Sequence, residues 1–532
     1  MKTKNILFAA FLVCLLSAAT SCNDLLDESY GSVPTANFHP KTDLEISALV
    51  NAAYIPWRKT MLLWNGVVRT QELSADQDVI PARIGIGWVD GYIYKRWHQH
   101  TWTTNDDGMY QPWSRTFEGI NTTNRIITQI EEGGIVLPSD QAKNSLLAEL
   151  RVLRASYYYI LIDLYGNVPL VTNFRDAALP KQSTRAEVFD FIVKEITDNI
   201  DLLSQEARGY YYGRMNKWVA HTLLAKMYLN AEVWRGQAMW QQCITQCDIV
   251  SASGFYSLEP NQKNVFVTEN QNSNEIIFAL PMDEKYVSDW NAFDFHMQTL
   301  AQESQQTYNM TFAPWGGVCA TPQFIESFNP DDKRLQQNYI QGPQFARNGD
   351  PLSINYTVSV PSIDQSDKDD GYRWGKFEIK IGAQNRLGND FPVFRYADIM
   401  LMKAEALMRS GQPGAGNLVT QVRLRNFDNA SVAIVTDQQL ILGSNYDYGR
   451  RDTYSETHEG SGDLIYGRFL DELGWEFCQE GRRRQDLIRF NAFTTRAWFS
   501  HDPSDSNKNL YPIPLQAIQT NSNLVQNPGY SN

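Results

Sequence analysis

A continuous apolar stripe between Ser145 and Tyr165 is the feature that most constrains how this chain folds. Its members follow one another in steps of four and three, which keeps side chains on one face of an α-helix: Leu146, Leu150, Leu153, Tyr157, Ile160 and Leu164. Gly166 and Pro169 come next, and both residue types end helices. Because a lone amphipathic helix leaves its apolar face exposed, the stripe predicts a helical packing partner.

Further helical segments follow along the chain. Thr184 with Glu187 forms a capping box, and a new stripe begins behind it, made of Phe189, Val193, Ile196, Ile200 and Leu203. Other helices are predicted over residues 216–232, 396–410, 415–425 and 463–480. Helices joined by short loops resemble tetratricopeptide repeats, although no strict 34-residue period is present. We therefore expect a mostly α fold with a tetratricopeptide-like scaffold of helical pairs.

Residues 251–394 have a different character. They are rich in Asn, Gln, Gly and Pro, and their periodicity is weak, so we expect loops and short strands laid over the helical frame. A chain of 532 residues exceeds the usual size of one hydrophobic core. We predict an N-terminal helical region over 41–250 and a C-terminal region over 251–532 that contains this loop-rich, aromatic ligand-binding part.

The first 21 residues are typical of a secretory signal. Lys2 and Lys4 precede an apolar run over residues 6–16, which is too short to span a bilayer. Small residues then lead to Cys22, an arrangement similar to the lipobox of bacterial lipoproteins, in which the cysteine is acylated. We expect a lipoprotein signal peptide over 1–21, lipidation at Cys22 and a tether over 22–40. An ordinary signal peptide that ends near a cysteine is the alternative.

The net charge of −13 argues against a nucleic-acid partner. An acidic surface repels phosphate backbones, and no basic run offsets this repulsion. The charge is better explained as a contribution to solubility.

Five segments resemble one known family. They are CNDLLDE (22–28), AELRVLRASYYYILIDLYGNVPLV (148–171), NDFPVFRYADIMLMKAEALMRSG (389–411), ELGWEFCQEGRRRQDLIRF (472–490) and YPIPLQAIQTNSNLVQNPGY (511–530). In this order they are similar to the motifs of the SusD/RagB family of surface glycan-binding lipoproteins. The chain departs from these motifs at Lys403, Cys478 and Arg484, which leaves the resemblance intact.

The resemblance implies both a location and a partner. Such proteins are lipid-anchored in the outer membrane, face the cell exterior, and capture polysaccharide or oligosaccharide for a SusC-like TonB-dependent transporter, over which they lie as a lid. It implies no catalysis and no cofactor. The charged motif residues Arg395, Asp398, Arg483 and Asp486 lie in apolar helical surroundings, where charges persist only when paired. We therefore interpret them as structural ion pairs.

The binding site is expected on aromatic loops. A sugar ring presents an apolar C–H face that packs on an aromatic ring, and its hydroxyl groups need polar partners. Aromatic residues gather in 85–113 and again in 286–315, roughly where the family builds its binding platform. We predict Trp88, Trp290 and Trp315 as the platform, then Tyr92 and Trp97, with Asp90, Asp289 and Asn291 as hydrogen-bonding residues. On their helical patterns, Trp218, Trp234 and Trp475 are predicted to be core residues.

The sequence lacks the short motifs of common catalytic and metal-binding sites. No P-loop, HExxH or GxSxG string is present. His98 and His100 alone do not predict a metal site, and the acidic loop over 364–371 has the wrong register for an EF-hand. Cys243, Cys247, Cys319 and Cys478 show no metal-type spacing, so we expect structural roles. An all-helical surface glycosidase, a repeat-type protein-interaction scaffold and a binder of peptides or other nutrients stay open as alternatives.

Overall fold

The computed structural model describes residues 42–86, 88–287, 289 and 291–531. The predicted signal peptide, the tether with Cys22, and Trp290 lie outside the described residues. Among the described helices, none combines the length and apolarity needed to cross a membrane.

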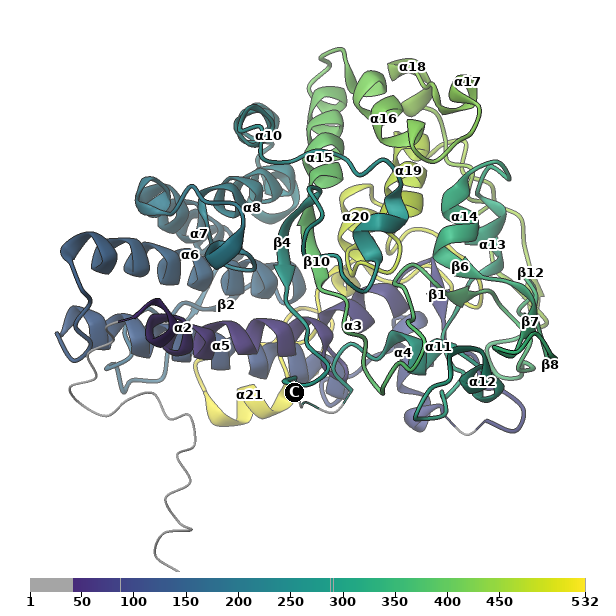
Figure 1. The fold of residues 1–532 in the computed structure, drawn as a ribbon, viewed down its shortest axis with the longest axis horizontal. Coiled ribbons are helices and arrows are strands. Elements are labelled where there is room, and N and C mark those ends of the chain that lie inside the picture. The colour runs from purple at the N-terminus through teal and green to yellow at the C-terminus, as the bar shows by residue number, and fades with distance from the viewer. Residues whose placement is uncertain (1–41, 87, 288, 290, 532) are drawn as a thin grey trace, which may run out of the picture.

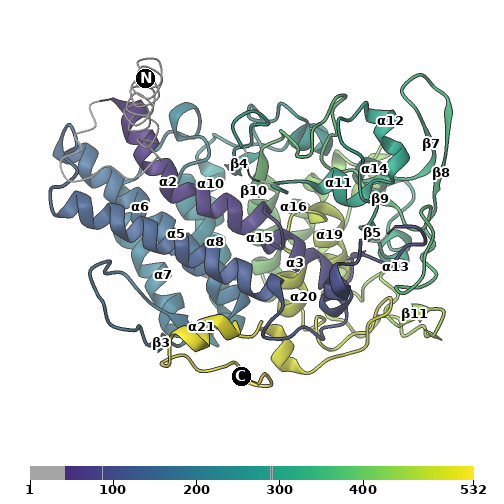
Figure 2. The ribbon, with the colours of Figure 1, turned by 90° about the horizontal axis from the view of Figure 1, so that it is seen from below.

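Helices dominate the described chain, and a group of the longer ones pack as neighbours (Figure 1). They are α2 (Asp43–Leu62), α5 (Asp107–Glu131), α6 (Asp140–Leu164), α7 (Arg185–Asn199), α8 (Lys217–Leu229), α10 (Trp240–Ala252), α15 (Tyr396–Arg409) and α16 (Ala415–Leu424). Figure 2 shows α2, α5 and α6 side by side, and α7 packs on α6. The row continues from α8 through α10 and α15 to α16. The predicted mostly α scaffold of helical pairs is confirmed.

The sequence signals for these helices act as expected. The stripe behind Ser145 lies within α6, where its residues are buried. At the start of α7, the Glu187 N–H donates to Thr184 Oγ1 at 3.2 Å and the Thr184 N–H donates to Glu187 Oε2 at 2.8 Å. This reciprocal cap fixes the first turn of the helix. The contacts of α15 with α8 and α10 carry the helical frame past residue 250, and the predicted boundary there stays a prediction.

The loop-rich part contains short helices and two-stranded sheets. Antiparallel pairs are formed by β1 (Asp78–Val79) with β5 (Cys319–Ala320), β4 (Ile276–Leu280) with β10 (Phe391–Arg395), β6 (Tyr339–Ile340) with β9 (Arg373–Trp374), and β7 (Gly342–Phe345) with β8 (Pro351–Tyr356). Outside this part, β2 (Val168–Pro169) pairs with β3 (Gln182–Ser183), and β11 (Arg451–Asp452) with β12 (Ser455–Glu456). The β1–β5 pair joins two segments that are about 240 positions apart, with Val79 opposite Cys319.

Short helices connect these parts: α3 (Val67–Leu73), α4 (Ile93–His98), α9 (Ala231–Arg235), α11 (Phe295–Thr299), α12 (Gln305–Tyr308), α13 (Pro322–Glu326), α14 (Lys333–Asn338), α17 (Ala430–Ala433) and α18 (Asp437–Leu440). The C-terminal part adds α19 (Gly467–Phe477), α20 (Arg483–Arg489) and α21 (Leu515–Thr520). The expected helix over 463–480 is shorter than predicted, because Tyr466 before it has a left-handed φ of 61° and Cys478 after it leaves the helical conformation, with ψ of 145°.

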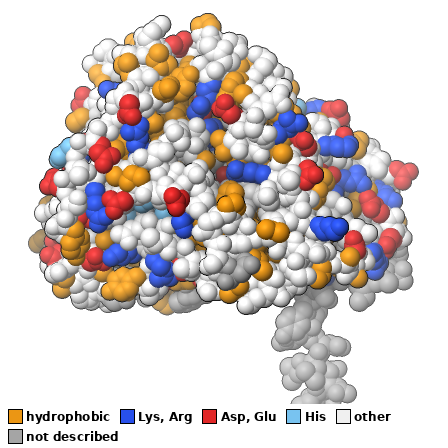
Figure 3. All heavy atoms as spheres, turned by 180° about the vertical axis from the view of Figure 1, so that it is seen from behind, with side chains coloured by type: hydrophobic (Ala, Val, Ile, Leu, Met, Phe, Trp, Pro, Cys, Tyr) orange, Lys and Arg blue, Asp and Glu red, His pale blue; other side chains and the backbone are white. Residues whose placement is uncertain are grey.

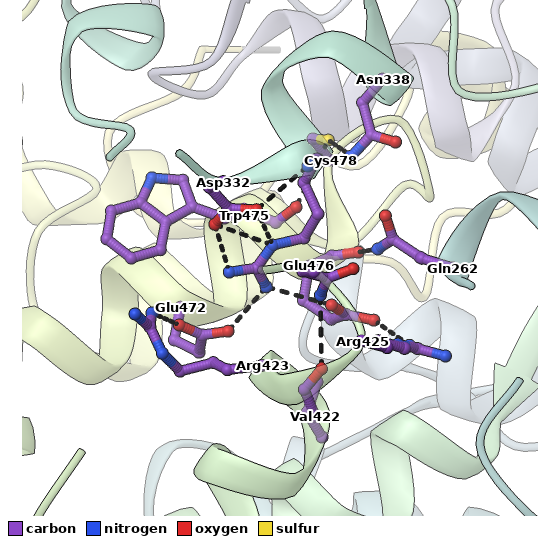
Figure 4. A network of polar contacts seen from close by, with 12 residues as sticks. Gln262, Asp332, Asn338, Val422, Arg423, Arg425, Glu472, Trp475, Glu476 and Cys478 are labelled. Atoms are coloured by element: carbon purple, nitrogen blue, oxygen red, sulfur yellow. Dashed lines mark hydrogen bonds and ion pairs between the residues drawn. The ribbon is translucent and has the colours of Figure 1, made fainter. Parts of the chain in front are cut away.

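A buried network of ion pairs holds the C-terminal helices to the frame (Figure 4). Arg395 contacts Glu275 and Glu476 at 2.7 Å each, and Arg425 contacts Glu476 at 2.6 Å. Burial would raise the pKa of Glu476, but the attraction of the surrounding cations outweighs it and holds this pKa well below its usual range. Figure 4 shows Arg423 reaching Glu472 in the same cluster, at 2.8 Å.

The other charged motif residues are paired as well. Arg483 donates two hydrogen bonds to Asp76, at 2.7 and 2.9 Å. Asp398 pairs with Arg482, and Asp486 contacts Arg482 at 2.9 Å. The prediction of structural ion pairing is confirmed. On the face opposite Figure 1, acidic and basic side chains are interspersed rather than segregated (Figure 3).

Candidate functional site

An open pocket lies where three loop segments meet, with a volume of about 640 Å³. The segments are the chain after α2, the loop before α4, and the chain from Asn291 to Trp315, which contains α11 and α12. We call this the indole pocket; its lining residues are Trp64, Gly85, Ile86, Trp88, Asp90, Asn291, Gln302, Ala313, Pro314 and Trp315. It combines aromatic faces with carboxylate and amide groups, which is the composition expected of a site for small polar ligands.

Three indoles form the aromatic part of the pocket, and each is half-buried. The ring centroids of Trp88 and Trp315 are 5.5 Å apart, and Trp64 lies 6.3 Å from Trp88 and 6.4 Å from Trp315. The planes are inclined by 50° to 71°. The rings therefore line a concave surface instead of a flat one, and part of each ring is open to solvent.

The backbone before α4 takes an unusual path that places Trp88. Asp90, Gly91 and Tyr92 are consecutive residues with φ between 43° and 63°, a left-handed conformation that is uncommon outside glycine. The Arg96 guanidinium donates to the Gly91 carbonyl at 2.8 Å and stabilises this turn. Trp88 therefore lies outside any regular helix.

Asp90 connects the turn to the aromatic rings. Its Oδ2 accepts from the Trp88 indole N–H at 3.1 Å and from the Tyr94 hydroxyl at 2.7 Å. Burial raises the pKa of Tyr94 well above its usual range, and the adjacent carboxylate adds to the rise. Tyr94 therefore stays protonated as a donor, and Asp90 fixes the orientation of the indole while its other oxygen faces no partner among the described residues.

The buried cation Arg69 packs against one of the rings that line the pocket. The Arg69 guanidinium carbon lies 4.4 Å from the Trp64 ring centroid, a cation–π contact. Arg69 also pairs with Asp294 at 3.2 Å and donates to Gln298 at 3.1 Å. Burial raises the pKa of Asp294 to about 6 even though Arg69 opposes the rise. Because Asp294 and Gln298 fix the position of the Arg69 guanidinium, its contact with the Trp64 ring also fixes that ring.

Two amides complete the pocket. Asn291 has a left-handed φ of 58°, and Gln302 is exposed at the start of the turn before α12. Within the described residues, neither side chain makes a hydrogen bond to protein, so both amides are free to bind a ligand. An amide both donates and accepts, which suits hydroxyl groups.

The structure brings four of the predicted site residues together: Trp88, Trp315, Asp90 and Asn291 all line the indole pocket. Tyr92 is 52% exposed next to this pocket but not part of its lining. Trp290 is outside the described residues. A role for these residues in ligand binding stays a prediction.

The structure corrects one expectation. Trp97 is not on a loop but in α4, and it has no exposed surface. Its ring packs against Tyr94 at 5.3 Å and covers Gly108, where any Cβ would overlap it, so it supports the pocket without reaching a ligand. Asp289 lies outside the lining and pairs with Arg58 at 2.9 Å, and its role as a hydrogen-bonding residue stays a prediction.

Sequence reasoning missed Trp64 and Gln302. Trp64 directly precedes Asn65 and Gly66, a dipeptide that marks turns, so its position just after a helix could have indicated a loop residue. By contrast, Trp218, Trp234 and Trp475 are buried as predicted.

The motifs set aside as non-catalytic have structural partners. His98 and His100 are buried, and His501 lies 4.3 Å from His100 between ring centroids. In the acidic loop, Asp364 contacts Lys95 at 2.5 Å, and Asp370 accepts from the Asp367 N–H at 2.6 Å. Among the described residues, no group of His, Cys, Asp and Glu is arranged to hold a metal ion. Cys243, Cys247, Cys319 and Cys478 are buried and free.

Comparisons with known proteins agree on one family. Residues 274–530 match the SusD family, and residues 75–229 match a family described as starch-binding associating with outer membrane. The chain is 26% identical over 432 residues to the starch-binding protein SusD of Bacteroides thetaiotaomicron, covering 72% of each chain.

Solved structures share the fold. A SusD superfamily protein from Parabacteroides distasonis is similar with a TM-score of 0.71 and 19% identity, over 92% of this chain and 100% of that one. Surface glycan-binding protein A from Bacteroides thetaiotaomicron, solved in complex with laminarihexaose, gives a TM-score of 0.71 and 20% identity over the same shares. The two family matches cover most of the described chain in the expected order, and the helical frame is shared: this protein belongs to the SusD/RagB family.

Proposed function

We propose that this protein binds a polysaccharide or oligosaccharide in the indole pocket at the cell surface. The observation that carries the proposal is the grouping of three half-exposed indoles, Trp64, Trp88 and Trp315, around a pocket of about 640 Å³. Indole faces suit the C–H faces of sugar rings. The free amides of Asn291 and Gln302 offer hydrogen bonds to hydroxyl groups.

The charge of the pocket favours a neutral ligand. Within the described lining, Asp90 is the one charged residue, and its carboxylate already accepts two hydrogen bonds. A cationic or strongly anionic ligand would need more charged partners. A neutral glycan needs none, so the composition supports a sugar over a charged nutrient or peptide terminus.

The same composition supports binding without catalysis. Hydrolysis of a glycosidic bond generally uses two carboxyl groups on opposite sides of the bond. Asp90 supplies one carboxylate to the described lining, and Asp289 is outside it and paired with Arg58. We therefore propose a binding protein that hands its ligand on unchanged.

Family membership supports the location and the partner. The chain has the leader and the lipobox-like Cys22 described above, and one matching family is described as associating with the outer membrane. We propose that Cys22 is lipidated, that the protein faces the exterior of the outer membrane, and that a SusC-like TonB-dependent transporter receives the glycan. Anchoring raises the effective concentration of a weak site at the surface.

Affinity electrophoresis tests the binding proposal. The intact chain is run through gels that contain plant, algal, fungal or host polysaccharides, beside the double variant Trp88→Ala with Trp315→Ala. We expect retardation of the intact chain in at least one gel and at least a tenfold loss of affinity in the variant. Tyr454→Ala removes a ring that is 66% exposed outside the pocket and serves as the matched control.

Three results would contradict the proposal. The first is equal retardation of the double variant and the intact chain. The second is the release of reducing ends from the retarding polysaccharide, which would indicate a glycosidase. The third is the absence of retardation in every gel of the panel.

A further inference from the structure

A second groove runs along α5, with a volume of about 990 Å³. One wall is a stripe on the helix itself: Tyr110, Trp113, Ser114, Phe117, Glu118 and Asn121. They occupy positions i, i+3, i+4, i+7, i+8 and i+11 of the helix, so they share one helix face. From Tyr110 to Asn121 the stripe is about 16 Å long at the usual helical rise. The groove shares no lining residue with the indole pocket.

The opposite wall is formed by the β2–β3 connection and by α21. Asn521 donates to the Pro180 carbonyl at 2.9 Å, and Asn523 donates to the Leu179 carbonyl at 2.8 Å. These bonds tie the connection to the chain that follows α21. The groove therefore has fixed walls contributed by three separate segments.

The wall formed by α5 is largely aromatic. Trp113 is 7% exposed and packs edge-on against Tyr165 at 5.0 Å. The Phe117 ring centroid lies 4.8 Å from that of Trp113, and both Tyr110 and Phe117 are half-buried. Partly exposed ring surface thus extends over two turns of α5, where C–H faces of a ligand could pack.

The polar groups that line the groove are mostly hydroxyls and amides without a bond to protein. Among the described residues, no hydrogen bond is made by the side chains of Tyr110, Ser114, Asn121, Thr172, Ser183 or Gln516. Charged side chains in the lining are confined to Glu118, Asp176 and Lys181. Hydroxyls and amides both donate and accept, as do the hydroxyl groups of a sugar.

We propose that this groove is a second carbohydrate-binding site that takes several units of an unbranched glycan. The proposal rests on the proposed glycan binding of the protein. A long polysaccharide would then engage one molecule at two places, and the second contact would raise the overall affinity without any change in the first. A polypeptide segment is the rival occupant, but the aromatic and neutral polar lining favours a sugar.

Calorimetry of the full chain with maltohexaose, laminarihexaose, xylohexaose and mannohexaose tests the groove. With a hexasaccharide that binds, we expect a stoichiometry of two for the intact chain and one for Trp88→Ala with Trp315→Ala. In that background, the groove variant Asn121→Ala with Gln516→Ala is expected to weaken the remaining site at least tenfold. Gln242→Ala removes an exposed amide on α10 and is expected to change nothing.

The outcomes separate the two sites. A stoichiometry of one that falls to zero in the Trp88 and Trp315 variant overturns the groove and leaves the indole pocket standing. A site that survives in this variant and does not respond to the Asn121 and Gln516 substitutions also overturns the groove. If the Trp88 and Trp315 variant keeps the stoichiometry of the intact chain, and binding is lost when Asn121 and Gln516 are also replaced, the result overturns the pocket instead. If none of the four hexasaccharides binds, the result contradicts both sites.

Discussion

The indole of Trp88 lies directly against the backbone of Gly317, so close that a Cβ at position 317 would overlap ring atoms Cζ3 and Cε3. Gly317 in turn donates its N–H to the Gln298 carbonyl at 2.7 Å, which holds this backbone in place. The orientation of Trp88 thus depends on the absence of a side chain more than two hundred residues further along the chain.

Gly317→Ala is therefore expected to displace Trp88 and weaken glycan binding about tenfold. Gly317 does not have a left-handed φ, so the substitution tests the packing of the ring and not backbone strain. Overpacking of this kind typically costs about 1–3 kcal/mol of stability. Affinity electrophoresis and thermal unfolding measure the two effects. Gly462→Ala, which has open space around its Cβ, is the control, and unchanged binding in Gly317→Ala would contradict the proposed role of Trp88.

Asp90→Ala should weaken binding by loosening the ring it holds. The variant leaves the Trp88 indole N–H and the Tyr94 hydroxyl without their shared acceptor. Asp90→Asn keeps one acceptor oxygen and should retain part of the affinity. Near-ultraviolet circular dichroism reports the loss of a fixed indole orientation. Asp289→Ala, outside the pocket, is expected to bind normally; a loss of binding there would return Asp289 to the site.

Arg395→Met is expected to cost about 3–5 kcal/mol of unfolding free energy, because it leaves Glu275, Glu476 and Glu480 buried with fewer cations. Urea denaturation at pH 7 measures the loss. The exposed Arg175–Glu132 pair provides the comparison, since solvent screens an exposed ion pair and Arg175→Ala should leave the unfolding free energy almost unchanged. Similar effects of the two substitutions would show that the buried network contributes little.

Acid should destabilise the fold through its buried histidines. Burial lowers the pKa of His98 to about 4 and of His100 to about 3, and it lowers the pKa of His501 well below its usual range. Below about pH 6.5 the unfolded chain gains protons on these side chains while the folded chain does not, so stability falls as the pH drops.

The variant His501→Phe isolates one of these groups. The ring stacks on Trp498 at 3.7 Å between centroids, and phenylalanine can keep that packing. Between pH 7.5 and pH 5, the variant should lose about 2 kcal/mol less stability than the intact chain, the linkage expected of one histidine that stays neutral. An unchanged pH dependence in His501→Phe would contradict the assignment.

Cys22→Ala should release the protein from the membrane fraction and abolish labelling with radioactive palmitate. Acyl chains on this cysteine are the proposed anchor, and stable anchoring requires more than one chain. Cys14→Ala changes a cysteine within the leader and should leave retention and labelling intact. Membrane retention of Cys22→Ala would refute the proposed lipidation.

Much of the frame could be predicted from the sequence because its signals are local. The stripe within α6 and the Thr184–Glu187 cap each depend on residues a few positions apart. The pocket depends on distant residues: Trp88 and Trp315 meet only because β1 pairs with β5 and the loop before α4 folds back. The aromatic composition indicated the right segments. It could not show that the Trp97 ring is buried against Gly108, or that Trp64, from a third segment, lines the same pocket.

The contact between Arg483 and Asp76 spans 407 positions of the chain. A ribosome or translocon delivers the polypeptide from its first residue, so Asp76 emerges as a bare carboxylate long before its guanidinium partner exists. The N-terminal helices therefore cannot complete their packing until the last fifth of the chain has been synthesised. Fragments that end before α20 should therefore aggregate or be degraded, because the chain reaches its native fold only when α20 is present.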